Sequence, residues 1–167
     1  MGGVTPFDDV LTANADYATT FEPTGRAGTA ARGLAVVTCM DSRIDPLAML
    51  GLEKGDAKIL RNAGGRVTED VLRTLVLATH LLGVARVMVV EHTDCKMASA
   101  TDEQVHAEIQ SLSGIDTRSL EFRTMDDQLA SVMQDVQRIR SSPYLRSGTE
   151  IGGFFYDVKT GRLQQVV

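Results

Sequence analysis

Several features that would assign a protein to a large class at once are missing from this chain. Its 167 residues include no tryptophan and only two cysteines. No uninterrupted apolar segment approaches the ~18 residues that a membrane-spanning helix needs. Basic residues number 17 against 22 acidic ones, which gives a net charge of −5. These absences exclude a disulfide-stapled fold, a membrane span and a general affinity for nucleic acid or anionic membrane surfaces.

Length and composition favour one ordinary domain. The chain is long enough to bury a core of its own, and its hydrophobic fraction of 43% and charged fraction of 23% are typical of a soluble globular protein. We therefore predict a single domain over residues 1–167. The first residues have neither the basic start nor the apolar core of a secretory signal, so we expect a cytoplasmic protein.

Residues 1–28 are predicted to form an N-terminal arm and its connector. Thr5, Pro6 and the acids that follow have the marks of a helix start: a capping hydroxyl, a proline in the first turn and negative charge near the helix N-terminus. A stretch that contains glycine and proline, residues 22–28, then separates this helix from the rest. The pattern fits an arm that packs on its own domain or on a partner subunit.

The remaining pattern alternates between apolar runs and amphipathic segments. Runs at 33–38, 57–60 and 86–90 are predicted strands, and the two longer ones are typical of strands buried on both faces of a parallel sheet. Helices are predicted from Thr68 to about 82, at 101–112 and at 124–141, and a strand, turn and short strand close the chain. The fold class is α/β: a mostly parallel central sheet flanked by helices, with an N-terminal helical arm. The side chains expected to face inward on the last two helices are Val105, Ile109, Leu112, Met125, Leu129, Val132, Met133, Val136 and Ile139.

Two short stretches directly follow the two longer predicted strands. Cys39-Met40-Asp41-Ser42-Arg43 follows the first, and His92-Thr93-Asp94-Cys95 follows the second. In open α/β sheets, ligands bind at the carboxyl ends of the strands, where the strand order reverses. Two thiols and one imidazole meeting there would suit zinc, with a fourth position left for water. The alternative for each cysteine alone is a small buried hydrophobic residue.

Asp41 and Arg43 are two residues apart, on the same side of an extended segment. A guanidinium can hold a carboxylate through two parallel hydrogen bonds. An ionised Asp41 could then accept a hydrogen bond from a zinc-bound water and orient the resulting hydroxide, since zinc lowers the pKa of its water toward ~7. The alternative is an ordinary exposed ion pair.

Gly64 and Gly65, in Arg61-Asn62-Ala63-Gly64-Gly65, lie between a predicted strand and the helix that begins near Thr68. Glycines allow the backbone to approach a ligand closely, and free N–H groups at a helix start favour anions. The turn would suit an anion of the size of bicarbonate. The alternative is a tight turn that needs positive φ, and the GxGxxG pattern of dinucleotide sites is absent.

The order of these motifs resembles the β-class carbonic anhydrases. The resemblance covers CMDSR, RNAGG, the helix TEDVLRTLVLATHLLG and HTDC, and the ending GFFYDVKTGRL is similar to that of compact bacterial members. It implies a carbonate dehydratase, a zinc lyase that reversibly hydrates CO2 to bicarbonate by a zinc-bound hydroxide, with one Zn2+ per chain. By position it implies Cys39, His92 and Cys95 as metal ligands and Asp41 with Arg43 as the catalytic dyad. It also implies a homodimer, sometimes paired into a tetramer, in which the N-terminal helix embraces the partner.

The chain departs from the family pattern at two points. Lys96 stands where the family usually has a glycine, directly after the second cysteine. The tryptophan that some members place in a non-catalytic bicarbonate pocket is absent. Two alternatives stay open: a zinc hydrolase of a related molecule such as CS2 or COS, which access and pocket shape would decide, and a non-catalytic zinc-binding relative, which Lys96 keeps in consideration.

Overall fold

The computed structural model describes residues 5–23, 25 and 27–167. The predicted arm and connector, residues 1–28, includes residues 1–4, 24 and 26, which lie outside the described residues. Five strands form one sheet in the order β2-β1-β3-β4-β5. Neighbouring strands are parallel from β2 to β4, and β5 is antiparallel to β4. The strands are β1 (Leu34–Cys39), β2 (Ala57–Asn62), β3 (Arg86–His92), β4 (Glu150–Tyr156) and β5 (Leu163–Gln165).

The predicted α/β architecture is confirmed. The helices are α1 (Asp8–Thr19), α2 (Glu69–Leu81), α3 (Asp102–Ser113) and α4 (Gln128–Arg140), with short 3-10 turns η1 (Ala48–Leu50), η2 (Ala63–Gly65) and η3 (Lys96–Ala98). Thr68 caps α2 as predicted, because its side chain accepts a hydrogen bond from the Val71 N–H. The helical arm is present as α1, but it begins at Asp8, whose carboxylate accepts hydrogen bonds from the Thr5 backbone N–H and hydroxyl.

The main core lies between one face of the sheet and the helices α2 and α4. Alternate residues of the central strands point to this face, because side chains in a strand alternate between faces. The other face packs against the segment around η1, and the Leu163 side chain of the edge strand β5 joins the same cluster. The core side chains of the first face are Ala35 and Val37 of β1, Val87 and Val89 of β3, Val71, Leu75 and Ala78 of α2, and Val132, Val136 and Ile139 of α4.

Two of the predicted helices differ from expectation. The last one begins at Gln128 rather than near 124, because the Asp127 side chain accepts the Ala130 N–H and caps the helix there. Met125 therefore lies before the helix, where it is buried beside the predicted metal ligands. The inward assignment of Leu129 and Met133 was wrong: only the stripe spaced three and four residues apart, from Val132 to Ile139, reaches the sheet. No residue of α3 is fully buried. Val105 and Ile109 are half-buried on its inner side, but the inward assignment of Leu112, which is 81% exposed, was wrong.

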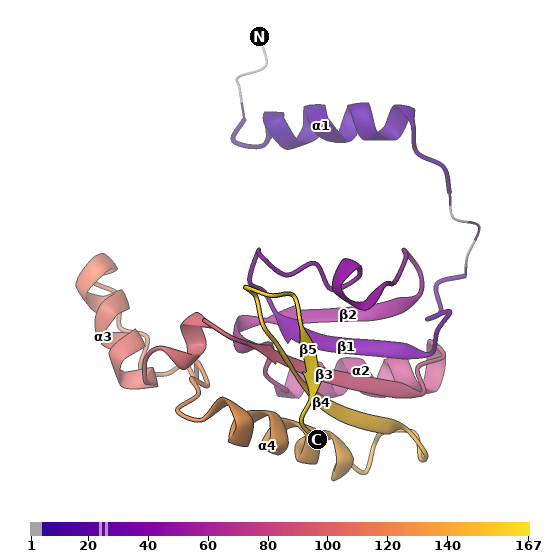
Figure 1. The fold of residues 1–167 in the computed structure, drawn as a ribbon. Helices are drawn as coiled ribbons and strands as arrows, with labels where there is room; N and C mark the ends of the chain where they lie inside the picture. The colour runs from indigo at the N-terminus through magenta and orange to yellow at the C-terminus, as the bar shows by residue number, and fades with distance from the viewer. Residues whose placement is uncertain (1–4, 24, 26) are drawn as a thin grey trace.

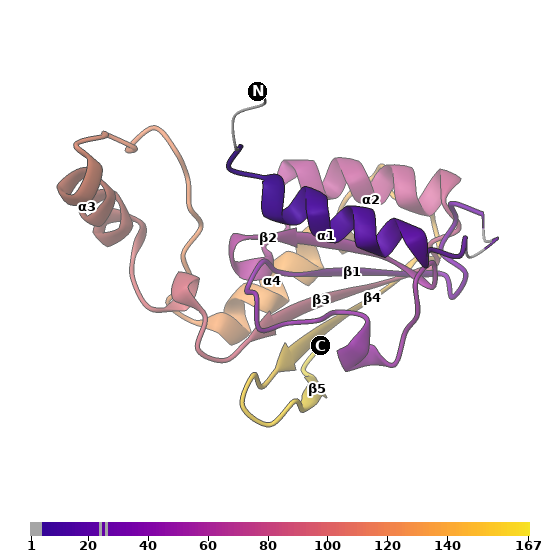
Figure 2. The ribbon, with the colours of Figure 1, turned by 90° about the horizontal axis from the view of Figure 1, so that it is seen from above.

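Two helices stand away from the sheet. Figure 1 shows α1 at a distance from the strands, joined to them by the connector. Figures 1 and 2 both show α3 projecting past the ends of the strands at which β1 and β3 finish. None of the described helices has both the length and the apolarity that a bilayer crossing requires.

The strand order places the reversal point between β1 and β3. The chain adds β2 on one side of β1, and then adds β3 and β4 on the other side. Loops that leave neighbouring strands at such a point diverge to opposite sides, which opens a crevice at the carboxyl ends. The two stretches singled out in the sequence leave the sheet at this crevice.

Candidate metal centre

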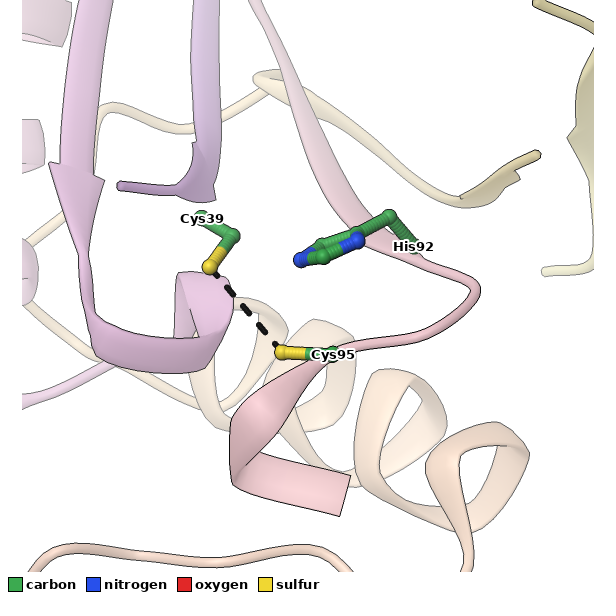
Figure 3. Close-up of side chains that lie close together, drawn as sticks. All are labelled: Cys39, His92 and Cys95. Carbon is green, nitrogen blue, oxygen red and sulfur yellow. Dashed lines mark hydrogen bonds between the residues drawn. The ribbon is translucent and has the colours of Figure 1, made fainter. Parts of the chain in front are cut away.

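The strands bring the three predicted ligands together. Cys39 is the last residue of β1, His92 is the last residue of β3, and Cys95 follows in the next loop. Because β1 and β3 are parallel neighbours, their ends lie side by side. The ligand atoms of Cys39, His92 and Cys95 all lie within 4.8 Å of one another, and all three residues are buried (Figure 3). The predicted long-range contact is therefore confirmed.

The imidazole of His92 is oriented to offer a lone pair. Its Nδ1 is 2.8 Å from the carbonyl oxygen of Thr93, which can only accept, so Nδ1 carries the proton. Its Nε2 then carries the lone pair. That atom is buried and makes no hydrogen bond within the described part of the chain. A buried, unpaired ring nitrogen is costly unless it binds something, and a metal ion fits this requirement.

The two sulfurs share a site that favours negative charge. Cys39 Sγ lies 4.0 Å from Cys95 Sγ, and both cysteines are free thiols. The pKa of Cys39 is lowered chiefly by a hydrogen bond from Cys95, and further by the neighbouring His92 side chain and by the backbone N–H groups of Asp41 and Gly64. The same pairing, together with burial, raises the pKa of Cys95. Two sulfurs and one imidazole nitrogen form a soft donor set that suits Zn2+ better than Mg2+ or Ca2+.

Apolar side chains surround the two sulfurs. They form a small cluster of their own, separate from the main core. Such a lining strengthens electrostatic interactions inside the site by limiting the access of water. The buried and half-buried members are Ile44, Met49, Met97, Ala98, Met125, Tyr156 and Val158.

Asp41 and Arg43 form the predicted ion pair beside the ligands. The Arg43 Nη2 is 2.7 Å from Asp41 Oδ2, its Nε is 3.0 Å from Oδ1, and its backbone N–H also donates to Oδ1. These contacts lower the pKa of Asp41, with the side-chain hydrogen bonds of Arg43 as the largest cause. Asp41 Oδ2 is 3.9 Å from His92 Nε2. An ionised carboxylate therefore lies next to the lone pair that would bind the metal.

Asp94 is a member of the site that the sequence analysis did not identify. The Arg43 Nη1 is 2.7 Å from Asp94 Oδ2, and the Nη2 is 3.0 Å from the Asp94 carbonyl oxygen. A signal was present, because a guanidinium has five N–H donors and one carboxylate cannot satisfy all of them. The acid between the ligands His92 and Cys95 was the obvious second acceptor.

Arg61 is a second residue that the sequence analysis missed. Its three guanidinium nitrogens donate to the backbone carbonyls of Cys39, Asp41 and Ile44, at 2.9, 2.6 and 3.1 Å. This single side chain therefore fixes the course of the loop that carries a ligand and the acid of the ion pair. The loop conformation that needs it could not be read from the sequence.

The structure gives the two glycines a packing role. Both are buried in η2 and have positive φ, +78° for Gly64 and +69° for Gly65. A Cβ on Gly65 would lie 3.0 Å from the backbone nitrogen of Cys39. Their predicted role in anion binding stays a prediction.

A buried ion pair supports the turn that contains these glycines. Arg66 Nε is 2.7 Å from Asp135 Oδ2, with side-chain exposures of only 11% and 3%. The same carboxylate accepts the Val67 N–H, and the Arg66 Nη1 donates to the carbonyl of Arg123. The Asn62 side-chain amide also closes the turn through two hydrogen bonds to the Arg66 backbone.

Lys96, the departure noted beside the second cysteine, extends away from the sulfurs. Its Nζ lies 3.4 Å from Glu108 Oε2 on α3, and both side chains are exposed. The charge is thus partly neutralised by α3, and the backbone of η3 forms without a glycine at this position.

Comparisons with known proteins place these features in a family. A family model described as carbonic anhydrase matches residues 34–163. Beta-carbonic anhydrase 1 of Mycobacterium tuberculosis is 39% identical over 165 residues, which cover 98% of this chain and 99% of that protein. The crystal structure of a carbonic anhydrase from Streptococcus mutans superposes with a TM-score of 0.91 at 36% identity and covers 99% of this chain and 100% of its own. A carbon disulfide hydrolase of an Acidianus strain is 32% identical over 160 residues, covering 80% of this chain and 77% of that protein. This chain belongs to the β-carbonic anhydrase family.

Proposed function

We propose that the protein is a zinc-dependent carbonic anhydrase that reversibly hydrates CO2 to bicarbonate, with Cys39, His92 and Cys95 as the zinc ligands. One observation carries this proposal: a buried set of two sulfurs and an unpaired imidazole nitrogen with an ionised carboxylate 3.9 Å from that nitrogen. Family membership supports the reaction and the metal. Zinc held by three protein ligands supplies Lewis acidity, which lowers the pKa of a water in its fourth position toward ~7.

The residues around this position have separate tasks. Asp41, held ionised by Arg43, accepts a hydrogen bond from the attacking water and so fixes its orientation toward the carbon of CO2. As the new C–O bond forms, the proton of the water leaves to solvent or buffer. The apolar cluster that contains Ile44 and Met97 favours uncharged CO2 over water beside the sulfurs. The Thr93 carbonyl keeps the His92 lone pair on Nε2.

Bicarbonate binding at Gly64 and Gly65 forms part of the proposal. Its support is that the backbone N–H of Gly64 lowers the pKa of the Cys39 thiol, so this donor lies beside the place where negative charge gathers. We expect Gly64→Ala to raise the KM for bicarbonate in the dehydration direction. An unchanged KM in a variant that folds and holds zinc would remove the glycines from substrate binding.

The test combines metal analysis with stopped-flow CO2 hydration. We expect about one zinc per chain and, in Asp41→Asn, a large loss of activity with zinc retained. Asp116→Asn is a matched control, because Asp116 and Arg118 form an ion pair of the same i, i+2 type at 2.6 Å on an exposed loop. Activity that survives in Asp41→Asn would remove this carboxylate from the mechanism. A zinc-loaded protein with no turnover would instead favour the non-catalytic relative.

Carbon disulfide hydrolysis is the second candidate, favoured by the 32% identity to the Acidianus enzyme. The same site chemistry would attack CS2, and access to the site would decide between the substrates. The identity and the coverage are both higher for the mycobacterial carbonic anhydrase, so CO2 is the preferred substrate. Release of hydrogen sulfide from CS2 at a rate above that of CO2 hydration would reverse this order.

The proposal includes a homodimer held in part by α1. This helix has no buried residue: its apolar side chains Val10 and Leu11 are 57% and 62% exposed, and Phe7, directly before it, is 67% exposed. A 12-residue helix is marginal in water unless its apolar face packs on something. The sheet face without a helix offers a groove of about 570 Å3, lined by Leu34, Leu50, Leu52, Met88 and Phe154 among others. The groove, whose lining also includes Arg32, Arg86, Glu150 and Gln165, is the place where we expect α1 of a second copy to pack.

Light scattering after size-exclusion chromatography tests the assembly. We expect a mass of two chains, or of four if dimers pair, and a shift toward one chain in Leu11→Asp. Thr12→Asp is the control on the same helix, because its hydroxyl bonds the Asp8 carbonyl of its own helix. A single-chain mass for the unmodified protein would refute the dimer.

Two broader proposals concern organisation and location. We propose that residues 1–167 form one domain, because a single sheet joins β1 to β5, and a single cooperative unfolding transition would support it. We also propose a cytoplasmic location, because two free thiols that must stay reduced suit a reducing compartment. Fractionation of cells that express the full chain tests the location.

A further inference from the structure

A second ion pair elsewhere in the chain has the same i, i+2 spacing and the same geometry as the pair of Asp41 and Arg43. Asp116 and Arg118 repeat its contacts: the backbone N–H and the Nε of the arginine donate to Oδ1 at 3.0 and 2.9 Å, and the Nη2 reaches Oδ2 at 2.6 Å. In the pair beside the sulfurs the corresponding distances are 2.9, 3.0 and 2.7 Å. This ion pair is therefore a local geometry that Asp-x-Arg adopts at both places in this chain. By itself it does not account for a fixed carboxylate at the metal centre.

The two pairs differ in what the arginine contacts on its remaining side. Arg118 contacts one carboxylate and is 76% exposed. Arg43 is also bound by the carboxylate of Asp94 at 2.7 Å and by the carbonyl of the same residue at 3.0 Å. All three of its guanidinium nitrogens are thus used, so the group cannot turn without breaking a charge-assisted hydrogen bond.

Asp94 belongs to the loop after β3, whereas Arg43 belongs to the loop after β1. The β3 loop is itself held to β4, because the Thr93 N–H donates to the Tyr156 carbonyl and the Thr93 hydroxyl accepts the Val158 N–H. The contact between Arg43 and Asp94 therefore ties the acid of the ion pair to a rigid part of the sheet. Asp94 holds a positive φ of +58°, a conformation that aspartate tolerates better than most residues and that glycine adopts freely.

We infer that Asp94 is a positioning residue for the reaction: by fixing Arg43 from the side opposite Asp41, it holds the Asp41 carboxylate in one orientation toward the metal centre. Asp94 acts only through Arg43 and Asp41 and does not touch the reacting atoms. This inference rests on the proposed function. The charged groups that act on Asp94 are Arg43, which lowers the pKa of its carboxyl most, Lys159, which lowers it further, and Asp41.

The first test measures whether the Arg43 guanidinium is held in one orientation, and it does not depend on enzyme activity. Nitrogen-15 NMR of the zinc-loaded protein at low temperature should show separate Nη proton signals for Arg43, because each Nη group is held. Arg118 in the same spectrum should show averaged signals, because only its Nε and Nη2 are held. In Asp94→Gly, the Arg43 signals should average like those of Arg118. Averaged Arg43 signals in the unmodified protein, or separate signals that persist in Asp94→Gly, would overturn the inference.

The second test reads the effect on the reaction. We expect Asp94→Gly to lower kcat about tenfold with KM within about twofold, the loss of one charge-assisted contact that acts in the transition state. Asp94→Asn keeps an acceptor oxygen for Nη1 and should retain most of the rate. Asp116→Gly removes the carboxylate of the second Asp-x-Arg pair and should leave kcat and KM unchanged. Zinc content and the urea midpoint should match the unmodified protein in both Asp94 variants, since glycine and asparagine both accept the +58° φ of this position.

A double variant separates this inference from the proposed function. If Asp94 acts through Asp41, then Asp94→Gly should produce no further loss in the residual rate of Asp41→Asn. Full activity in Asp41→Asn alone would refute the dyad of the proposed function. Loss of activity in Asp41→Asn combined with an unchanged kcat in Asp94→Gly would leave the proposed function standing and overturn only the role of Asp94. Independent, additive losses would also overturn it.

Discussion

Substitution of Gly65 by alanine should damage both stability and zinc binding, because the glycine packs against the backbone of a ligand. Its φ of +69° is costly for any residue with a Cβ. The added Cβ would lie 3.0 Å from the Cys39 nitrogen and 3.0 Å from the Thr38 carbonyl carbon, where ordinary contacts are 3.4–4 Å. Backbone atoms of a central strand cannot move aside as the end of a flexible side chain can, so Cys39 itself must shift.

The magnitude follows from two contributions. A left-handed φ costs a non-glycine residue about 1–2 kcal/mol, partly offset by the ~0.4–1 kcal/mol that alanine gains by restricting the unfolded chain. Overpacking of a tight site adds about 1–3 kcal/mol. The expected loss is therefore about 2–4 kcal/mol in the free energy of unfolding, a large fraction of the 5–15 kcal/mol of an average domain.

Gly51→Ala isolates the backbone contribution, because Gly51 has a φ of +61° and no atom within 4 Å of its added Cβ. Urea unfolding of the metal-free proteins gives the two losses, and competition with a chromophoric chelator gives the zinc affinities. We expect Gly65→Ala to lose more than Gly51→Ala by about 1–3 kcal/mol and to bind zinc more weakly, while Gly51→Ala keeps the original affinity. Equal losses and equal zinc affinities would refute the packing role assigned to Gly65.

Three further predictions concern stability. Asp135→Asn should lower the free energy of unfolding, measured with urea, by about 3–5 kcal/mol, because it leaves Arg66 buried without its charge partner. Asp70→Asn, in an exposed pair with Arg73, should lower it by less than about 0.5 kcal/mol. Equal losses would contradict the burial argument. The pKa of Asp102 is lowered to about 2, chiefly by a hydrogen bond from Thr124, against ~3.9 in the unfolded chain. Its stabilising effect is therefore complete above about pH 4 and lost as the pH falls through 2, so the urea midpoints of the protein and of Asp102→Asn should converge between pH 4 and pH 2; a gap that persists at pH 2 would speak against it. Removal of zinc by a chelator should lower the free energy of unfolding by RT ln(1 + [Zn]/Kd), about 4 kcal/mol at a thousandfold excess over Kd, and should lower the melting temperature with it. Cys39→Ser should abolish this difference, and a melting temperature unchanged by the chelator would exclude a metal that supports the fold.

The elements that were predicted correctly from the sequence are determined by residues that lie close together in the chain. Strand β1 and the start of α2 follow from an apolar run and from the Thr68 cap, and each is decided by residues within a few positions. The convergence of Cys39 with the His92 loop also followed, because a parallel sheet with a strand-order reversal brings those strand ends together. The start of α4 was missed because a cap at Asp127 competed with a periodic pattern that continued upstream of it.

The errors at the site have a different cause, since they concern side chains that satisfy groups presented by other loops. The role of Arg61 depends on three backbone carbonyls, and these point toward its guanidinium only once the loop after β1 has folded. The role of Asp94 depends on the N–H groups of Arg43 that remain free to donate after Arg43 has bound Asp41. Periodicity and spacing describe which residues share a face, but not which donors remain unfilled. A count of donors and acceptors adds information of that kind: an arginine paired with one carboxylate still has N–H groups that a second acceptor can bind. For Arg43, the acid between the two ligands is a candidate for that second acceptor, because the neighbouring ends of β1 and β3 bring Asp94 within its reach.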